Sequence, residues 1–182
     1  MNEKELNYKE TWEGLYKGVN YEIVKWRLGW DYYLKIPVEQ IPEDVKSKFN
    51  LRGRTLSQTS KDILFYDYSN KPIISDLDWH CGITFYEKTR NDRGEVVGYK
   101  LGCDYAHLWD EGKCFTLDYV IGEAKHSIDK LLEYIPDLKI RCAWNGKYYK
   151  RDEIYYNQYG VSIALENKEN WERPLVSPEV KE

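Results

Sequence analysis

The sequence has little that would mark a membrane, secreted or metal-ribbon protein. Its four Cys show no C-x-x-C spacing, which excludes a zinc ribbon and a thioredoxin-like motif. No stretch approaches the roughly 20 apolar residues that a membrane-spanning helix needs. Three of the first five residues (Met-Asn-Glu-Lys-Glu) are charged, and no apolar segment follows them, unlike a signal peptide. We therefore expect a cytosolic protein whose cysteines are thiols rather than disulfides.

Signatures of several enzyme classes are also missing. There is no G-x-S-x-G nucleophile elbow, no P-loop and no glycine-rich dinucleotide fingerprint, so the corresponding hydrolase, NTPase and dehydrogenase classes find no support. The chain also has no net positive charge, since it contains 27 basic and 31 acidic residues and its formal charge is −4. This balance disfavours a protein that binds nucleic acid through overall positive charge.

Aromatic residues are what the chain has in quantity. It contains 7 Trp, 17 Tyr and 4 Phe, but a single Met, and 42% of its 182 residues are hydrophobic. This composition excludes wholesale disorder and favours strands over an all-helical bundle, since Tyr and Trp suit half-buried sheet surfaces. The length predicts one domain over residues 1–165, followed by a mobile tail over residues 166–182.

The first third of the chain alternates between strand and turn signals. Residues 1–20 predict a short helix from the spacing of Trp12, Leu15 and Tyr16. Residues 21–27 and 32–36 predict two antiparallel strands, and Pro42 opens a short helix. Residues 45–61 predict an exposed loop, because they carry no acidic side chain and five basic ones: Lys46, Lys48, Arg52, Arg54 and Lys61.

The best-defined local pattern is a hairpin over residues 80–104. Two alternating segments flank Asp92-Arg93-Gly94, a three-residue loop that suits a hairpin because Gly tolerates its last position. Pairing residue 91 with residue 95 places Phe85 opposite Leu101 and Ile83 opposite Cys103, so both apolar sets share one face. The same register pairs Asp104 with Gly82.

The last third predicts one long helix and further strands. Apolar residues recur at helical spacing over residues 117–135, with Thr116 as N-cap and Pro136 as the stop. His126 lies opposite the apolar stripe and is expected to face solvent. Residues 138–144 predict a strand, Asn145-Gly146 predicts a hairpin turn, and residues 154–165 predict one more strand. The fold class is therefore α+β: a mostly antiparallel sheet built from hairpins, with one long amphipathic helix packed across it.

A cluster of polar residues converges at one end of the predicted hairpin: His80, Asp104, His107 and Asp110. Three interpretations compete. His80, His107 and one carboxylate form a legitimate three-ligand metal set. A metal-free site would pair His80 with Asp104 as base and orienting carboxylate. The third interpretation, which we favour, is a structural network that satisfies backbone groups at the strand ends.

The charges are segregated along the second half of the chain. Residues 104–123 carry five acids against the single base Lys113, and residues 139–151 carry five bases interleaved with aromatic residues. An acidic surface predicts a partner with a basic, nucleic-acid-binding surface, whereas the basic hairpin predicts stacking with single-stranded bases. Solvated faces explain both clusters equally well. The candidate partner-binding residues are Trp109, Asp110, Glu111, Asp118, Glu123, Trp144, Tyr148 and Tyr149, and those for direct nucleic-acid contact are Lys147, Lys150 and Arg151.

Two segments resemble a family of small phage and prophage proteins. Residues 80–84 (His-Cys-Gly-Ile-Thr) resemble its His-Gly-Gly-Ile/Leu-Thr strand, with Cys81 in place of the first Gly. Residues 102–110 resemble its Gly-x-Asp-x-Ala-His-x-x-Asp segment, and the likeness covers roughly residues 75–135. In length and character the chain also looks like a type II-A anti-CRISPR.

The resemblance implies a cytoplasmic protein of an infected bacterium that binds the RNA-guided nuclease Cas9, or its complex with guide RNA. Such a protein would block DNA engagement or cleavage without catalysis and without a cofactor. Two alternatives stay open. One is a small hydrolase or nuclease, metal- or His/Asp-dependent, centred on His80, Asp104, His107 and Asp110. The other is a single-strand-binding module that uses Trp144, Tyr148 and Tyr149.

Overall fold

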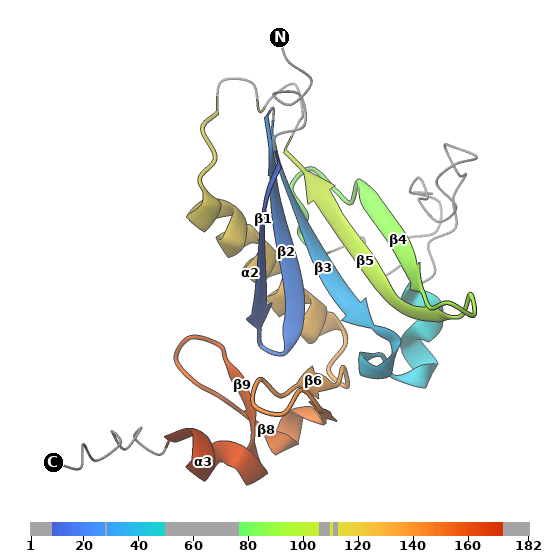
Figure 1. Cartoon of the computed structure of the whole chain (residues 1–182), viewed down its shortest axis with the longest axis vertical. Coiled ribbons are helices and arrows are strands. Elements are labelled where there is room, and N and C mark those ends of the chain that lie inside the picture. The colour runs from blue at the N-terminus through green and yellow to red at the C-terminus, as the bar shows by residue number, and fades with distance from the viewer. Residues whose placement is uncertain (1–8, 28, 50–76, 106–109, 111–112, 173–182) are drawn as a thin grey trace, which may run out of the picture.

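A five-stranded antiparallel sheet forms the body of the molecule. The computed structural model describes residues 9–27, 29–49, 77–105, 110 and 113–172. The sheet has the order β1-β2-β3-β5-β4 (Figure 1). Its strands are β1 (Lys9–Tyr16), β2 (Val19–Trp26), β3 (Trp30–Pro37), β4 (Phe85–Arg90) and β5 (Val96–Asp104). The α+β prediction is confirmed, as is the antiparallel pairing of the segments predicted at 21–27 and 32–36.

The helix predicted within residues 1–20 is wrong for its described part, which is strand β1. β1 pairs with β2 across a two-residue turn in which Lys17 and Gly18 have φ of 45° and 77°, as tight hairpins require. Exposure along β1 changes with a period of two, and Trp12 pairs with Ile23. Gly14 lies so close to the Tyr21 ring that a Cβ would come within 2.3 Å of it. Pairing with β2 thus outweighs the helical spacing of three aromatic and apolar residues.

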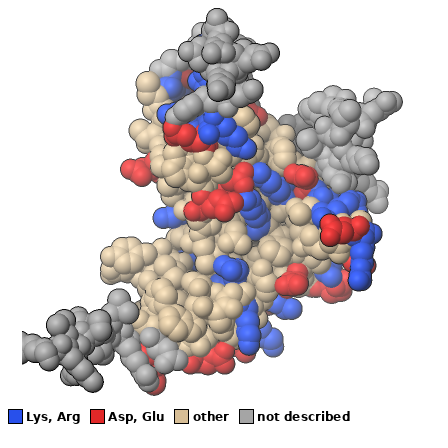
Figure 2. Space-filling view, viewed as in Figure 1, with Lys and Arg blue, Asp and Glu red and all other residues tan. Residues whose placement is uncertain are grey.

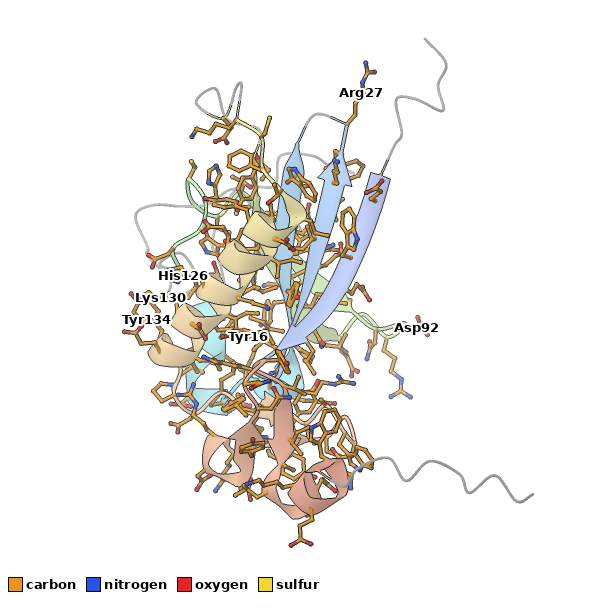
Figure 3. All side chains as sticks on the ribbon, turned by 90° about the vertical axis from the view of Figure 1, so that its left-hand side faces the viewer. Tyr16, Arg27, Asp92, His126, Lys130 and Tyr134 are labelled. Atoms are coloured by element: carbon orange, nitrogen blue, oxygen red, sulfur yellow. The ribbon has the colours of Figure 1, made fainter. Side chains whose placement is uncertain are left out.

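Helix α2 (Leu117–Tyr134) covers one face of the sheet (Figures 1 and 3). Its boundaries confirm the prediction, and the Thr116 side chain accepts a hydrogen bond from the Tyr119 amide at 3.2 Å. The buried hydroxyls of Tyr32 on β3 and Ser127 on α2 lie 2.8 Å apart and join the two layers. None of the helices among the described residues is long and apolar enough to cross a membrane.

The opposite face of the sheet carries interleaved charges (Figure 2). Glu22 is buried on this face and lies between two lysines, with Lys35 Nζ at 2.5 Å and Lys100 Nζ at 2.7 Å. Burial alone would raise the pKa of Glu22, but the hydrogen bonds from Lys100 and Lys35 outweigh it and hold the pKa below its ordinary value. Lys35 also contacts Glu13 at 2.6 Å. The four charges form a chain across four strands, β1, β2, β3 and β5, which keeps this face polar without a covering layer.

The predicted register of the 80–104 hairpin is wrong by one residue. The loop closes as predicted, with the Asn91 amide donating to the Glu95 carbonyl at 3.0 Å. A β-bulge then shifts the ladder, because Thr89 pairs with Gly98 while Arg90 pairs with Val96. An extra residue in one strand exchanges the two faces. Tyr86, rather than Phe85, therefore faces Leu101 in the core.

Part of the loop predicted over residues 45–61 is helical. A 3₁₀ helix spans Glu43–Phe49, and its Phe49 side chain is fully buried. Tyr86 donates a hydrogen bond to the Phe49 carbonyl at 2.5 Å. The difference arises from Phe49. The prediction used only the charges of the segment, and these carry no information about one apolar side chain that is buried in the core. Residues 50–61, with three of the five predicted basic side chains, lie outside the described residues.

A small lobe, which we define as residues 138–172, follows α2 and lies below the body in Figure 1. It contains strands β6 (Ile140–Arg141), β7 (Tyr148–Tyr149), β8 (Ile154–Tyr156) and β9 (Ser162–Ala164), paired as β6-β7 and β8-β9. The single strand predicted over 154–165 is wrong, because a turn ending at Gly160 (φ 76°) folds the segment into a hairpin. Of the mobile tail predicted over residues 166–182, Lys168–Glu172 form helix α3, and residues 173–182 lie outside the described residues.

The turn between β1 and β2 anchors the small lobe to the body. The Lys17 amide donates to the Gly160 carbonyl at 2.7 Å. The buried Gln40 side chain donates to the carbonyls of Gly18 and Lys139, both at 2.9 Å. One side-chain amide thus ties this turn to the start of the lobe, and the lobe is fixed at the end of α2 opposite Thr116.

Candidate functional site: a buried histidine–aspartate pair and an exposed aromatic lobe

His80 and Asp110 form a largely buried pair near the N-terminus of α2. The Nε2 of His80 lies 2.9 Å from Oδ2 and 3.1 Å from Oδ1 of Asp110. The side chains are only 13% and 3% exposed. A carboxylate removed from water in this way needs a hydrogen-bond donor, and the His80 ring supplies one.

Aromatic rings enclose this pair. His80 stacks on Tyr105 with ring centroids 4.1 Å apart, and Phe115 meets His80 edge-on at 5.6 Å. Tyr119 contacts both Tyr105 and Phe115. We call the five residues His80, Tyr105, Asp110, Phe115 and Tyr119 the His80 cluster. Burial raises the pKa of Tyr105 above its ordinary value, so its hydroxyl keeps its proton.

A tight turn places His80 in this position. Asp78 and Cys81 on either side of it have φ of 53° and 58°, the left-handed region that non-glycine residues rarely adopt. The Gly82 amide closes the turn by donating to the Trp79 carbonyl at 3.2 Å. Trp79 stacks on Tyr32 in the core. Cys81 therefore adopts a backbone conformation that glycine favours.

Asp104, predicted to pair with Gly82 beside His80, lies on the other face of the sheet. It pairs with Asp31 on β3. The bulge shifts the separate β4–β5 ladder by one residue, so Gly102 pairs with Phe85 rather than with Thr84 and the register that placed Asp104 opposite Gly82 does not hold. Its amide donates to the Thr84 hydroxyl at 3.0 Å. Burial raises the pKa of Asp31; hydrogen bonds from Trp26 and Tyr33 oppose this rise, and the charge of Asp104 adds to it. The structure thus pairs His80 with Asp110 and places Asp104 beside another carboxylate.

Three of the predicted site residues, His107, Trp109 and Glu111, lie outside the described residues. Among the side chains that the structure does describe, no three His, Cys, Asp or Glu are grouped so that they could hold a metal ion. None of the four cysteines takes part in a disulfide, as predicted. Cys103 and Cys142 are buried, whereas Cys81 and Cys114 are exposed.

The acidic segment 104–123 does not form one surface in its described part. Asp118 is exposed and Glu123 is half-buried, both on α2. Asp110 is buried against His80, and Asp104 lies on the uncovered face of the sheet. His126 is exposed as predicted, and its Nε2 lies 3.2 Å from Asp78.

The basic and aromatic residues predicted at 139–151 belong to the small lobe. Trp144 is 53% exposed and meets the Trp171 ring edge-on at 6.1 Å. Tyr148 and Tyr149 are half-buried, and the Tyr149 hydroxyl donates to Glu166. Lys147 and Lys150 are exposed, but Arg151 donates to the Leu132 carbonyl at the end of α2, at 2.6 Å.

Sequence reasoning missed Tyr105, Phe115 and Tyr119 as neighbours of His80. The alternation of side chains along the strand could have identified Tyr105, because Tyr105 follows Cys103 by two residues and so lies on the same face of the sheet. Phe115 and Tyr119 carry no such signal, since only the fold brings the start of α2 to the His80 turn. A scan against protein-family models and searches of curated proteins and of solved structures found no match to this chain.

Proposed function

We propose that this protein is a non-catalytic inhibitor of the RNA-guided nuclease Cas9, which it binds through the small lobe. The observation that carries the proposal is the exposed pair of Trp144 and Trp171. Aromatic side chains are among the residues that most often contribute the largest share of the binding energy at protein interfaces. The choice of target rests on the resemblance to type II-A anti-CRISPR proteins.

The distribution of apolar surface supports the small lobe as the binding region. Eight large hydrophobic side chains are exposed in the described residues. Four of them belong to the lobe, although it is much the smaller part of the chain: Trp144, Tyr159, Leu165 and Trp171. Exposed Lys147 and Lys150 border this region. An apolar centre with a charged rim is the usual anatomy of a protein interface.

The experiment is a DNA cleavage assay with purified Cas9 and guide RNA at increasing concentrations of this protein. The wild type is expected to inhibit cleavage, and the Trp144→Ala/Trp171→Ala double variant is expected to need at least about tenfold more protein. Tyr134→Ala is the matched control, because Tyr134 is 45% exposed but belongs to α2. Full Cas9 activity at saturating wild-type protein contradicts the proposal.

The His80–Asp110 pair is the observation that favours the hydrolase alternative, because a carboxylate that orients an imidazole is a common acid–base arrangement. A His80→Gln variant separates the two functions. The binding proposal predicts that the folded variant still inhibits Cas9. Cleavage of DNA or RNA by the wild-type protein alone, lost in this variant, replaces the binding proposal with catalysis. Salt-sensitive binding to bare single strands points instead to a nucleic-acid module.

A further inference from the structure

Strand β1 is an edge strand of the five-stranded sheet, with β2 as its neighbour (Figures 1 and 3). Hydrogen-bonded and non-hydrogen-bonded pairs alternate along an antiparallel ladder. The two-residue turn makes Tyr16 and Val19 a hydrogen-bonded pair. Alternate residues of β1 therefore direct their main-chain N–H and C=O groups away from β2, toward the open edge: Lys9, Thr11, Glu13 and Leu15.

These outward main-chain groups have no hydrogen-bond partner within the part of the chain that the structure describes. β1 also lacks the features that usually protect an edge, because its eight residues pair with β2 without a bulge and include no proline. The other edge strand, β4, is shorter, and the bulge at Thr89/Arg90 interrupts its ladder. A long, regular and unpaired edge such as β1 is a template for a further strand.

The charges along this edge are complementary to those of a second copy. Lys9, Thr11 and Glu13 are exposed, and the Glu13 side chain is 69% exposed although it contacts Lys35. Charged residues on an edge ordinarily discourage pairing. Here, however, the two charges have opposite signs and lie two residues on either side of Thr11. A twofold axis at Thr11 thus places Lys9 of each copy opposite Glu13 of the other.

The neighbouring symmetric registers lack this complementarity. A twofold axis at Lys9, Glu10 or Glu13 would place two like charges directly opposite each other, which is destabilising. An axis at Trp12 would bring no opposite charges together. The axis at Thr11 forms two pairs of opposite charge and also pairs the two Thr11 side chains, and both kinds of cross-strand pair are favourable.

We propose that two copies of this chain associate through their β1 strands, antiparallel and with Thr11 on the twofold axis. The association joins the two sheets into one continuous sheet. Both α2 helices then lie on one face, because residues opposite each other in a ladder share a face of the sheet. The inference does not depend on the proposed inhibition of Cas9, since it uses β1 rather than the exposed tryptophans of the small lobe.

Sedimentation equilibrium of the full chain tests this inference. A short strand pair buries less surface than most stable interfaces. The wild type is therefore expected to be in a monomer–dimer equilibrium with a Kd of about 100 µM or tighter. A chain that stays monomeric at about 1 mM overturns the inference.

Charge reversal tests the register. Lys9→Glu and Glu13→Lys each place like charges opposite each other in a homodimer, and each is expected to weaken association at least about tenfold. An equimolar mixture of the two variants is expected to associate about as well as the wild type, because each charge then meets its opposite. The matched control is Lys147→Glu in the small lobe, which is expected to leave association unchanged.

The mixture separates an interface from a change within one copy. Glu13→Lys also removes the contact with Lys35, but this loss persists in the mixture and so cannot account for recovery. A mixture that associates no better than the separate variants overturns the register at Thr11. Association that is unchanged in both separate variants overturns it as well.

A proline variant tests the main-chain hydrogen bonds. Thr11→Pro removes an N–H that is directed away from β2, and edge strands tolerate proline at such positions. The variant is expected to keep the circular dichroism spectrum of the wild type and to be monomeric at about 1 mM. If folded Thr11→Pro dimerises as the wild type does, while Trp144→Ala/Trp171→Ala is monomeric, the copies meet through the small lobe and the inference is overturned.

Discussion

The two ends of the molecule use aromatic residues in opposite ways. In the His80 cluster the rings pack inward around the buried His80–Asp110 hydrogen bond, whereas in the small lobe Trp144 and Trp171 face solvent. The composition of both regions is similar, so composition alone does not tell them apart. Burial does, because one set of rings packs in the interior and the other is exposed; we propose an interaction role only for the exposed set. The following predictions test that division.

The largest expected effect is on the buried pair. His80→Ala leaves the Asp110 carboxylate, 3% exposed, without its imidazole, and is expected to lower the free energy of unfolding by about 3 kcal/mol. Trp144→Ala removes an exposed ring and is expected to change it by less than about 0.5 kcal/mol. Urea unfolding at pH 7 measures both. Equal losses in the two variants would break the contrast between the two ends.

A smaller loss is expected where helix and sheet meet inside the body. Tyr32→Phe removes one of the two buried hydroxyls that lie 2.8 Å apart and leaves Ser127 without that partner. The expected cost is about 1–2 kcal/mol. The Tyr32→Phe/Ser127→Ala double variant is expected to be more stable than the sum of the single losses predicts. Strict additivity of the two losses would show that the hydroxyls act independently.

The uncovered sheet face is expected to respond to acid. The pKa of Glu22 is lowered in the folded protein, so its contribution to stability is present above the unfolded value of 4.5 and is lost as the pH falls through the folded value. Glu22→Gln is expected to cost about 1–2 kcal/mol at pH 7 and almost nothing at pH 2. Urea midpoints of wild type and variant across this range measure the convergence. A gap that stays constant with pH would contradict the assignment.

The smallest expected effect is a gain. Gly122 lies inside α2, where an added Cβ meets no other atom within 4 Å. Gly122→Ala is therefore expected to raise the free energy of unfolding by about 0.5–1 kcal/mol. Gly102→Ala is the opposite case, because a Cβ there would come within 2.0 Å of the Tyr32 carbonyl. A thermal melt compares the two, and destabilisation by Gly122→Ala would show that the space above α2 is occupied.

Sequence patterns predicted the elements whose signals are local. The α2 boundaries follow from Thr116 and Pro136, and strands β2 and β3 follow from alternation alone. The residues around His80 could not be predicted in this way, because their positions depend on a β-bulge. One extra residue at the Thr89/Arg90 bulge reverses the faces of the hairpin. The sequence placed both Asp104 and Asp110 in one cluster with His80, but the unreversed register made Asp104 the expected partner of the imidazole, whereas the structure pairs His80 with Asp110. A bulge has no dependable sequence signal when the flanking residues, as here, are compatible with either register.

The pairing of β3 with β5 joins two parts of the chain that can each form from local contacts. β1 to β3 form a meander and β4 and β5 form a hairpin, but Pro37 meets Gly98 and Asp31 meets Asp104. Contacts so distant in sequence form slowly, because the intervening chain must first be closed into a loop. The entropy of that closure grows only with the logarithm of loop length, about 0.6 kcal/mol for each doubling. The pairing of β3 with β5 therefore governs the folding rate, while insertions between the two halves cost little stability.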